Sequence, residues 1–400
     1  MIGALALLAA QVTAPLAGYE LIHNAPEGTT LATPDLREPA TVWCAMLKDA
    51  RHEADFEQFY VAGKPGEALD RVIGCMEQAA RRGVKIRFLM EGQGVKMSDA
   101  PTLARLRAIR NLDLRILDFA KVSGSGIIHA KFFVVDGKSA YVGSQNFDWR
   151  SLRHIDETGV KIDDRHAVDQ LGAIFAHDWA AQATLAAGGK VAPTNSGEAV
   201  ADDTGPATLV ASPNAFNPAG VGDSQAELVR LLGQSQHEIR ITVMTYAPLS
   251  YGGGYYGVID NALRAAAARG VSIKLIVADW NLSRTKTPWL VSLAAVPHVE
   301  IRVATIPEAA EGPIPFARVI HTKTMEIDGQ IAWVGTSNWE GGYLDNSRNV
   351  ELVFRDAGMA ERIAGMHERL WASTYAEPLD AAIVRRLAED GQKAAAPAGN

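Results

Sequence analysis

Apolar runs and helical periodicity follow one another in the same order in two parts of the chain. In the first part, an apolar strand pattern at 58–60 precedes a loop with Gly and Pro, a helical pattern over 67–82 and an apolar strand pattern over 84–89. The same order recurs over 244–276 at a nearly constant offset in residue number (246 − 60 = 186 and 270 − 83 = 187). A strand–helix–strand crossover that occurs twice predicts an α/β fold of two related halves with mostly parallel, buried strands.

These patterns divide the chain into five segments. We expect the halves at 19–186 and 208–380, because the intervening 187–207 is rich in Gly, Pro, Ser, Asp and Thr and has no periodicity, as is typical of a linker. A C-terminal tail is expected over 381–400. Residues 1–18 contain an apolar run that ends in small residues, as in a secretory signal. We therefore expect a secreted or periplasmic protein, and a cytoplasmic location stays open because no Lys or Arg precedes the run.

Composition excludes several classes of protein. With 48% hydrophobic and 21% charged residues, the 400-residue chain is globular rather than disordered. Its 39 Lys and Arg against 46 Asp and Glu give a net charge of −7, which argues against binding of a long nucleic acid. No later stretch is apolar over about 18 residues, so we expect no membrane span. We expect transient contact with a membrane surface at most. Cys44 and Cys75 lack CxxC spacing, which excludes a cysteine zinc site; two buried thiols are favoured and one disulfide stays open.

The clearest chemical signal is a motif that occurs twice. The first copy comprises His129, Lys131 and Asp136, followed by Ser144 and Asn146 in a Gly-Ser-Gln-Asn turn. The second copy comprises His321, Lys323 and Asp328, followed by Ser337 and Asn338 in a Gly-Thr-Ser-Asn turn. The His, Lys, Asp and Asn positions all differ in number by the same amount (321 − 129 = 192, for example). The constant displacement predicts two copies of one structural unit.

Each copy has the chemistry to hold a phosphate. His and Lys two residues apart on a strand point to the same face, so both can reach one small anion. The apolar residues and Asp-Gly that follow predict a hairpin, whose returning strand ends in the turn that carries Asn146 or Asn338. Backbone N–H groups and the Asn amide there could hold phosphoryl oxygens. Asp136 and Asp328 complete the candidate catalytic motif, although Asp-Gly is more typical of a turn than of a reactive group.

Two copies supply the two groups that in-line displacement at phosphorus requires. A nucleophile attacks from one side while a proton donor protonates the leaving oxygen opposite, and each copy offers one imidazole. We assign His129 as nucleophile and His321 as general acid; the near symmetry of the copies leaves the reverse open. A carboxylate behind one ring would keep that ring protonated. The candidates for orienting the histidines are Glu157 and Glu351, which follow the histidines of their own halves at similar spacing (157 − 129 = 28 and 351 − 321 = 30).

The paired motif resembles that of the phospholipase D superfamily, in which HxKxxxxD occurs twice in one chain around a shared active site. The resemblance extends from about Glu53 to Tyr375. The sequence of residues 335–339 is similar to that found in the branch of poxvirus envelope phospholipases and endolysosomal phospholipase-D-like exonucleases. The sequence of residues 150–152 is similar to that found in bacterial cardiolipin synthases. The resemblance implies two pseudo-symmetric α/β/α halves, each with a seven-stranded type of sheet, a phosphohistidine intermediate, and no metal or other cofactor.

Other features are given structural interpretations. Residues 252–257 fit GxGxxG, but the loop before them is too long for the tight turn of a dinucleotide site, and a substrate-facing loop is favoured. Trp149 and Trp339 directly follow the two turns and are expected to wall the pocket. The remaining histidines have no metal-ligand spacing with one another or with carboxylates and are expected at the surface or in the core: His23, His52, His154, His166, His177, His237, His298 and His367.

These observations predict a monomeric phosphodiesterase with one shared site, which hydrolyses a phosphodiester or transfers it to an alcohol. A phospholipid is the favoured substrate, because the chain is acidic and has no Lys- and Arg-rich segment. A nuclease that acts on single-stranded nucleic acid ends is the alternative, supported by the resemblance of the second half to exonucleases. A fold retained without catalysis is disfavoured, since both His and both Lys are intact.

Overall fold

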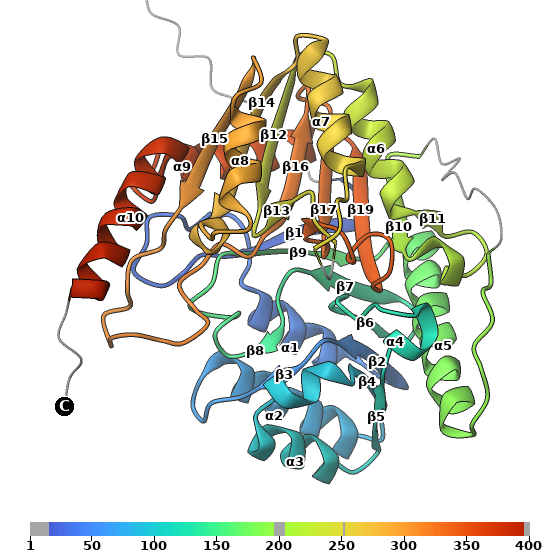
Figure 1. The fold of residues 1–400 in the computed structure, drawn as a ribbon. Helices are drawn as coiled ribbons and strands as arrows, with labels where there is room; N and C mark the ends of the chain where they lie inside the picture. The colour runs from blue at the N-terminus through green and yellow to red at the C-terminus, as the bar shows by residue number, and fades with distance from the viewer. Residues whose placement is uncertain (1–15, 196–204, 251–252, 396–400) are drawn as a thin grey trace, which may run out of the picture.

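The computed structural model describes residues 16–195, 205–250 and 253–395. It contains two α/β halves, each built around one large sheet with helices packed against it (Figure 1). The apolar run of the expected secretory signal, within residues 1–15, lies outside the described residues. No helix within the described ranges is long and apolar enough to cross a membrane.

The first half contains a seven-stranded sheet of order β1-β9-β7-β6-β2-β4-β5 and a separate pair, β3 and β8. Side chains of α1, α2 and α3 pack on one face of the sheet and those of α5 on the other. The elements are β1 (Tyr19–Asn24), α1 (Pro39–Asp49), β2 (Glu53–Gln58), β3 (Val61–Ala62), α2 (Ala68–Arg81), β4 (Lys85–Glu91), the 3-10 helix η1 (Gln93–Met97), α3 (Ala100–Ala108), β5 (Leu112–Leu117), α4 (Ala120–Ser123), β6 (Phe132–Val135), β7 (Ser139–Gly143), β8 (Phe147–Asp148), β9 (Glu157–Ile162) and α5 (Arg165–Ala186).

The second half contains a nine-stranded sheet of order β11-β10-β19-β17-β16-β12-β14-β15-β20 and a separate pair, β13 and β18. The two strands beyond the seven that were expected are the short edge strands β11 and β20. The elements are β10 (Ala207–Ser212), η2 (Asn214–Phe216), β11 (Gly222–Asp223), α6 (Ser224–Gln234), β12 (Glu238–Val243), β13 (Tyr246–Ala247), α7 (Val258–Ala268), β14 (Ser272–Ala278), η3 (Asp279–Asn281), α8 (Thr287–Ala294), β15 (Val299–Ala304), β16 (Lys323–Ile327), β17 (Ile331–Gly335), β18 (Trp339–Glu340), β19 (Asn349–Arg355), α9 (Ala357–Trp371), β20 (Ala376–Pro378) and α10 (Leu379–Ala395).

Both predicted crossovers are present. β2 and β4 pair in parallel and are joined through α2, and β12 and β14 pair in parallel and are joined through α7. The expectation of mostly parallel sheets is wrong, because β6, β7 and β9 and their counterparts β16, β17 and β19 pair antiparallel. The hairpin turn that follows each His-x-Lys pair requires an antiparallel neighbour.

One large hydrophobic cluster contains residues of both halves. The long helix α5 packs against strands of its own sheet and against β10 of the second half. Leu171 and Phe175 of α5 belong to the same buried cluster as Val334 of β17 and Leu352 of β19. β17 also packs against β7 and β9. The strands that follow the two motifs therefore meet near the middle of the molecule (Figure 1).

Two expectations outside the site are wrong. Cys44 of α1 and Cys75 of α2 form a disulfide instead of remaining as thiols, because the two helices pack side by side on the same face of the sheet. The segment from 381 onward was expected to be a tail, but α10 continues through it to Ala395. Its Ala, Leu, Arg and Glu residues favour a helix, and Leu379 and Ala382 are buried in the second-half core.

Candidate active site

Each His-x-Lys pair lies where a strand of the motif hairpin begins. β6 starts directly after Lys131, and β16 starts at Lys323. The Nζ atom of each lysine donates a hydrogen bond to the backbone oxygen of its own histidine, His129 or His321. All four side chains are buried. Each half therefore holds an imidazole and an ammonium group together inside the protein.

Backbone hydrogen bonds between the halves bring the two pairs together. The N–H groups of His129 and Ala130 both donate to the backbone oxygen of Arg348, at 2.9 and 2.8 Å. In the same way, the N–H groups of His321 and Thr322 donate to the backbone oxygen of Asp156, both at 2.9 Å. Asp156 and Arg348 are themselves related by the motif displacement (348 − 156 = 192). The structure thus joins each motif to the opposite half and forms one shared site.

The groups behind the histidines differ from those predicted. Glu157 does orient a histidine, but it is the one in the opposite half: Oε2 of Glu157 lies 2.8 Å from Nδ1 of His321. His129 is paired with Asn349, whose Oδ1 lies 3.0 Å from Nδ1 of His129. Glu351 is not the partner of either ring. Sequence analysis missed Asn349, which holds the position equivalent to Glu157 in the second copy (349 − 157 = 192), because only carboxylates were considered.

Glu351 instead supports the second phosphate-binding turn. Its Oε1 accepts a hydrogen bond from the Ser337 hydroxyl at 2.5 Å, and its Oε2 accepts one from Ser224. Burial raises the pKa of Glu351 to about 7. The hydroxyl of Ser144 in the first turn is also bonded within the protein, to the backbone of Thr158. Ser144 and Ser337, which were predicted to bind substrate as members of these turns, therefore use their hydroxyls within the protein, and substrate binding by the backbone N–H groups of the turns stays a prediction.

The two asparagines of the turns fit the predicted role better. Asn146 and Asn338 are 7% and 5% exposed, and the Oδ1 atom of each has no hydrogen-bond partner among the described residues. Buried polar atoms are nearly always hydrogen-bonded in folded proteins. The two unpartnered Oδ1 atoms can accept hydrogen bonds from a bound group, and the Nδ2 group of each amide is the part that could donate to a phosphoryl oxygen.

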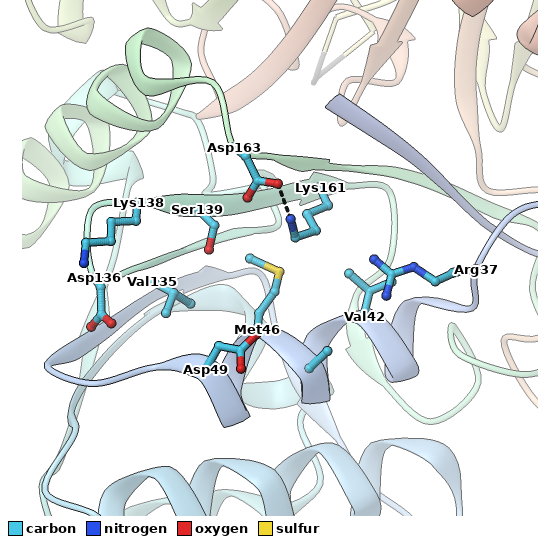
Figure 2. A pocket seen from close by; sticks show the side chains of 11 residues that line it. Arg37, Val42, Met46, Asp49, Val135, Asp136, Lys138, Ser139, Lys161 and Asp163 are labelled. Carbon is cyan, nitrogen blue, oxygen red and sulfur yellow. Dashed lines mark hydrogen bonds and ion pairs between the residues drawn. The ribbon is translucent and has the colours of Figure 1, made fainter. Parts of the chain in front are cut away.

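The motif aspartates lie at the hairpin turns, beyond the far ends of β6 and β16. Asp136 and Asp328 have positive φ angles of 52° and 55°. Each carboxylate accepts hydrogen bonds from three successive backbone N–H groups, those of 51–53 and 236–238 respectively. Asp136 and Lys138 line a pocket of about 370 Å³ (Figure 2). Asp136 follows the last residue of β6, whereas His129 precedes the first. The structure thus agrees with the interpretation of these aspartates as turn residues and not as reactive groups.

Burial and neighbouring charge set the protonation of the site. Burial lowers the pKa of His129 well below its usual value, and the positive charges of Lys131 and Lys323 lower it further. Burial also lowers the pKa of His321, but Glu157 opposes that shift. The pKa of Lys323 falls to about 7, chiefly through burial. The pKa of both imidazoles is therefore lowered, that of His129 more strongly, because only His321 has a carboxylate beside it to oppose the effect of burial.

Aromatic side chains wall the site on the side of His129. The rings of Phe59 and Tyr343 lie 5.7 and 4.8 Å from its imidazole, and both remain partly exposed. Sequence analysis missed both residues. Of the two tryptophans expected in this role, Trp149 is half-buried beneath Lys64, whereas Trp339 is 1% exposed and packs in the core. Part of the Gly-rich loop that we expected to face substrate, 251–252, lies outside the described residues.

Known proteins share this architecture. A family model described as "Cardiolipin synthase, PLD-like domain" matches residues 43–179 and 228–371. Phospholipase D Z of Dictyostelium discoideum is 31% identical, over 84% of this chain and 85% of that protein. The human 5'-3' exonuclease PLD4 is 30% identical, over 90% of this chain and 78% of that protein. The phosphatidylserine synthase of Haemophilus influenzae Rd KW20 superposes with a TM-score of 0.61 over 90% of this chain and 87% of that chain, at 10% identity, which shows a common fold. With a family model matched over most of its length and a shared two-motif site, this chain belongs to the phospholipase D superfamily.

Proposed function

We propose that the protein is a phosphodiesterase in which His129 attacks phosphorus and His321 is the general acid. The observation that carries the assignment is the hydrogen bonding of Asn349. Its Nδ2 donates to the backbone oxygen of Tyr343 at 3.0 Å, and its Oδ1 accepts from the Thr336 hydroxyl at 3.0 Å. The amide is thereby oriented with its oxygen toward Nδ1 of His129, so Nδ1 must carry the proton and Nε2 keeps a free electron pair.

The reaction follows from these protonation states. Nε2 of His129 attacks phosphorus and forms a P–N bond, while the P–O bond to the leaving group breaks and His321 gives its proton to the leaving oxygen. His321, now neutral, takes a proton from water as the water oxygen attacks phosphorus. The P–N bond breaks and its electron pair returns to His129. Glu157 stabilises His321 each time that ring is charged.

The remaining groups of the site neutralise the phosphate. Burial lowers the pKa of Lys131 and Lys323, and a bound phosphate would favour their charged forms, so that both lysines neutralise it. The amides of Asn146 and Asn338 supply dipoles. In a site with little water, such preorganised groups stabilise the developing negative charge more strongly than they would in solvent. These groups take the place that metal ions have in other phosphodiesterases, so the chemical steps require no divalent ion.

A phospholipid is the substrate that we favour. Several cations in loops near the site are already paired with carboxylates: Arg150 with Asp148 at 2.7 Å, and Lys286 with Glu340 at 2.8 Å. Such pairs leave little free positive charge for a polyanion. Exposed apolar side chains occur at the end of η1 and in the loops that follow β13 and β15, namely Met97, Tyr255 and Phe316. Such exposed apolar groups suit a substrate with acyl chains.

An oxidising compartment fits this proposal. The disulfide between Cys44 and Cys75 would persist in a secreted or periplasmic protein, whereas cytosolic thiols are usually kept reduced. The apolar N-terminal run points the same way.

Hydrolysis of a single-stranded nucleic acid from its end is the second candidate. The partly exposed rings of Phe59 and Tyr343 beside His129 could stack on a nucleobase, a contact that tolerates any sequence. The human relative is named as a 5'-3' exonuclease. Incubation with labelled phosphatidylcholine and with a labelled single-stranded oligonucleotide in parallel, both with EDTA, separates the two. We expect release of the lipid head group; release of mononucleotides alone would favour the second candidate.

The His321→Ala variant tests the mechanism directly. A nitrophenolate leaving group needs little protonation, so His129 should still attack a nitrophenyl phosphodiester, while hydrolysis of the adduct stalls without its base. Intact mass should then show one phosphoryl group, stable to alkali and labile to acid, and peptide mapping should place it on His129. The His129→Ala variant should form no adduct. An adduct on His321 in that variant would reverse the roles, and no adduct in either would contradict a covalent intermediate.

A further inference from the structure

Three loops far apart in the chain bring together a histidine and two carboxylates outside the active site. Glu27 follows β1, His154 lies between β8 and β9, and Glu311 lies in the loop between β15 and β16. One potential ligand atom from each residue lies within 4.8 Å of the other two. Glu27 and His154 belong to the first half and Glu311 to the second, so the cluster spans the two halves.

The state of His154 points to a bound ligand. Its side chain is fully buried, yet neither ring nitrogen has a hydrogen-bond partner in the part of the chain that the structure describes. Leaving a buried polar group without a partner costs about 1 to 3 kcal/mol, so such groups are rare. Its Nε2 lies 3.4 Å from Oε1 of Glu311. Two ligands at about 2.1 Å from a tetrahedral zinc ion are separated by about this distance.

We propose that Glu27, His154 and Glu311 bind a zinc ion. One imidazole nitrogen and two carboxylate oxygens form a ligand set that zinc accepts, with water in the fourth position. Calcium and magnesium prefer sites made of oxygen alone. Zinc bound here would be structural, because none of its ligands takes part in the catalytic steps described above.

The neighbouring charges leave room for the ion. Nε of Arg153 donates to Oε2 of Glu27 at 2.6 Å, which leaves Oε1 of Glu27 for the metal. The guanidinium group of Arg318 donates to the backbone oxygens of Pro307 and Glu27 and not to a carboxylate. Among the described residues, Glu311 has no Arg or Lys within ion-pair distance.

The ion would fasten a long loop to the first half. The loop from β15 to β16 covers residues 305–322 and leads directly into Lys323 of the second motif. It is already held by Arg150, whose Nη1 donates to the backbone oxygen of Pro315 at 3.0 Å. Closing so long a loop is costly in entropy, and a metal that binds only the closed form offsets this cost.

Zinc binding to variants tests the site. In equilibrium dialysis against micromolar ZnCl₂, with metal analysis of the protein, the wild type should bind one zinc per chain. His154→Ala, and independently the less disruptive Glu311→Gln, should weaken binding about tenfold or more. His166→Ala, the same change at an exposed histidine of α5, is the matched control and should leave binding unchanged. Equal binding by all four proteins, or none by the wild type, would overturn the proposal.

A second measurement reports the loop itself. Zinc should slow trypsin cleavage after Arg318 in the wild type and in His166→Ala, whereas in His154→Ala the rate should not respond to zinc. Cleavage that is indifferent to zinc in the wild type would contradict the proposed fastening. The His154→Ala variant should also turn over substrate equally with and without EDTA. A metal-requiring reaction at the histidine pair would instead show loss of turnover with EDTA in this variant too, so failure of the catalytic proposal and failure of the zinc proposal remain distinguishable.

Discussion

One amide in place of a carboxylate distinguishes two otherwise equivalent histidines. Glu157 and Asn349 occupy equivalent positions in the two copies (349 − 157 = 192), and each contacts Nδ1 of the histidine in the opposite half. Burial lowers the pKa of both histidines, and the carboxylate of Glu157 opposes this shift at His321, whereas the neutral amide adds no charge beside His129. In the mechanism that we propose, this difference of one functional group decides which histidine attacks phosphorus and which one donates the proton.

Exchanging these groups should move opposite limbs of the pH profile. Asn349→Asp places a carboxylate beside His129 and raises its pKa. Because attack needs the neutral ring, the acid limb of kcat/KM should move to higher pH, with about a tenfold loss per pKa unit below both limbs. Glu157→Gln lowers the pKa of His321, so the proton donor is lost sooner as pH rises and the alkaline limb should move to lower pH. Profiles of kcat/KM across the acid and alkaline limbs measure both shifts.

A reversed result would be equally clear. If Asn349→Asp moved the alkaline limb and Glu157→Gln the acid limb, His321 would be the nucleophile. If both variants instead had a uniformly lower kcat/KM at all pH values, with neither limb displaced, the two residues would only hold the rings in place. Asn349→Gln keeps a neutral amide at this position and controls for changes in packing.

The sequence pattern predicted which residues supply the chemistry better than it predicted their partners. The constant displacement located both His-x-Lys pairs, and the structure brings them together. Glu351 was chosen as a partner because it is a carboxylate at similar spacing in its own half, but its number does not match the motif displacement from Glu157 (351 − 157 = 194). The contacts of Glu157 and Asn349 run between halves, and no local pattern in the chain reports such pairing.

At the scale of elements, two hairpins are the functional unit. β6 with β7, and β16 with β17, were predictable from their apolar strands and Asp-Gly turns, whose carboxylates bind three backbone N–H groups each. The parallel crossovers through α2 and α7 were predictable from helical periodicity. The antiparallel pairing of β9 with β7 and of β19 with β17 was not predictable, because it depends on long-range contacts. The helix α10 was missed because that segment was judged by its Ala- and Gly-containing end.

Each hairpin should be indispensable if they form one site. Lys131→Ala and Lys323→Ala should each lower kcat/KM on the order of 10²-fold or more, because each removes a preorganised charge from the same transition state. Lys138→Ala, at the exposed turn of the first hairpin, is the control and should retain activity. Steady-state measurement of kcat/KM for the three variants and the wild type on one substrate tests this prediction. About half of the wild-type rate remaining in each single variant would indicate two independent sites.

At the scale of the whole molecule, a buried ion pair joins the halves. Arg348 of the second half and Asp178 of α5 are both fully buried, with Nε and Oδ2 at 2.6 Å. The guanidinium group also donates to the backbone oxygens of Ser212 and Phe216. Through its own backbone oxygen Arg348 holds His129. With one hydrophobic cluster drawn from both halves, we expect the chain to unfold as a unit.

Replacing Arg348 tests this coupling. Arg348→Met keeps a long side chain but leaves the charge of Asp178 buried, with His177 at 2.7 Å as its remaining ion-pair partner among the described residues. The free energy of unfolding in urea should fall by about 3 to 5 kcal/mol, and Arg348→Met with Asp178→Leu should recover much of it, because no lone charge remains. Arg165→Ala, which breaks the exposed pair with Asp169, should change stability by about 0.5 kcal/mol or less. An Arg348→Met protein as stable as Arg165→Ala would mean that the pair does not hold the halves together.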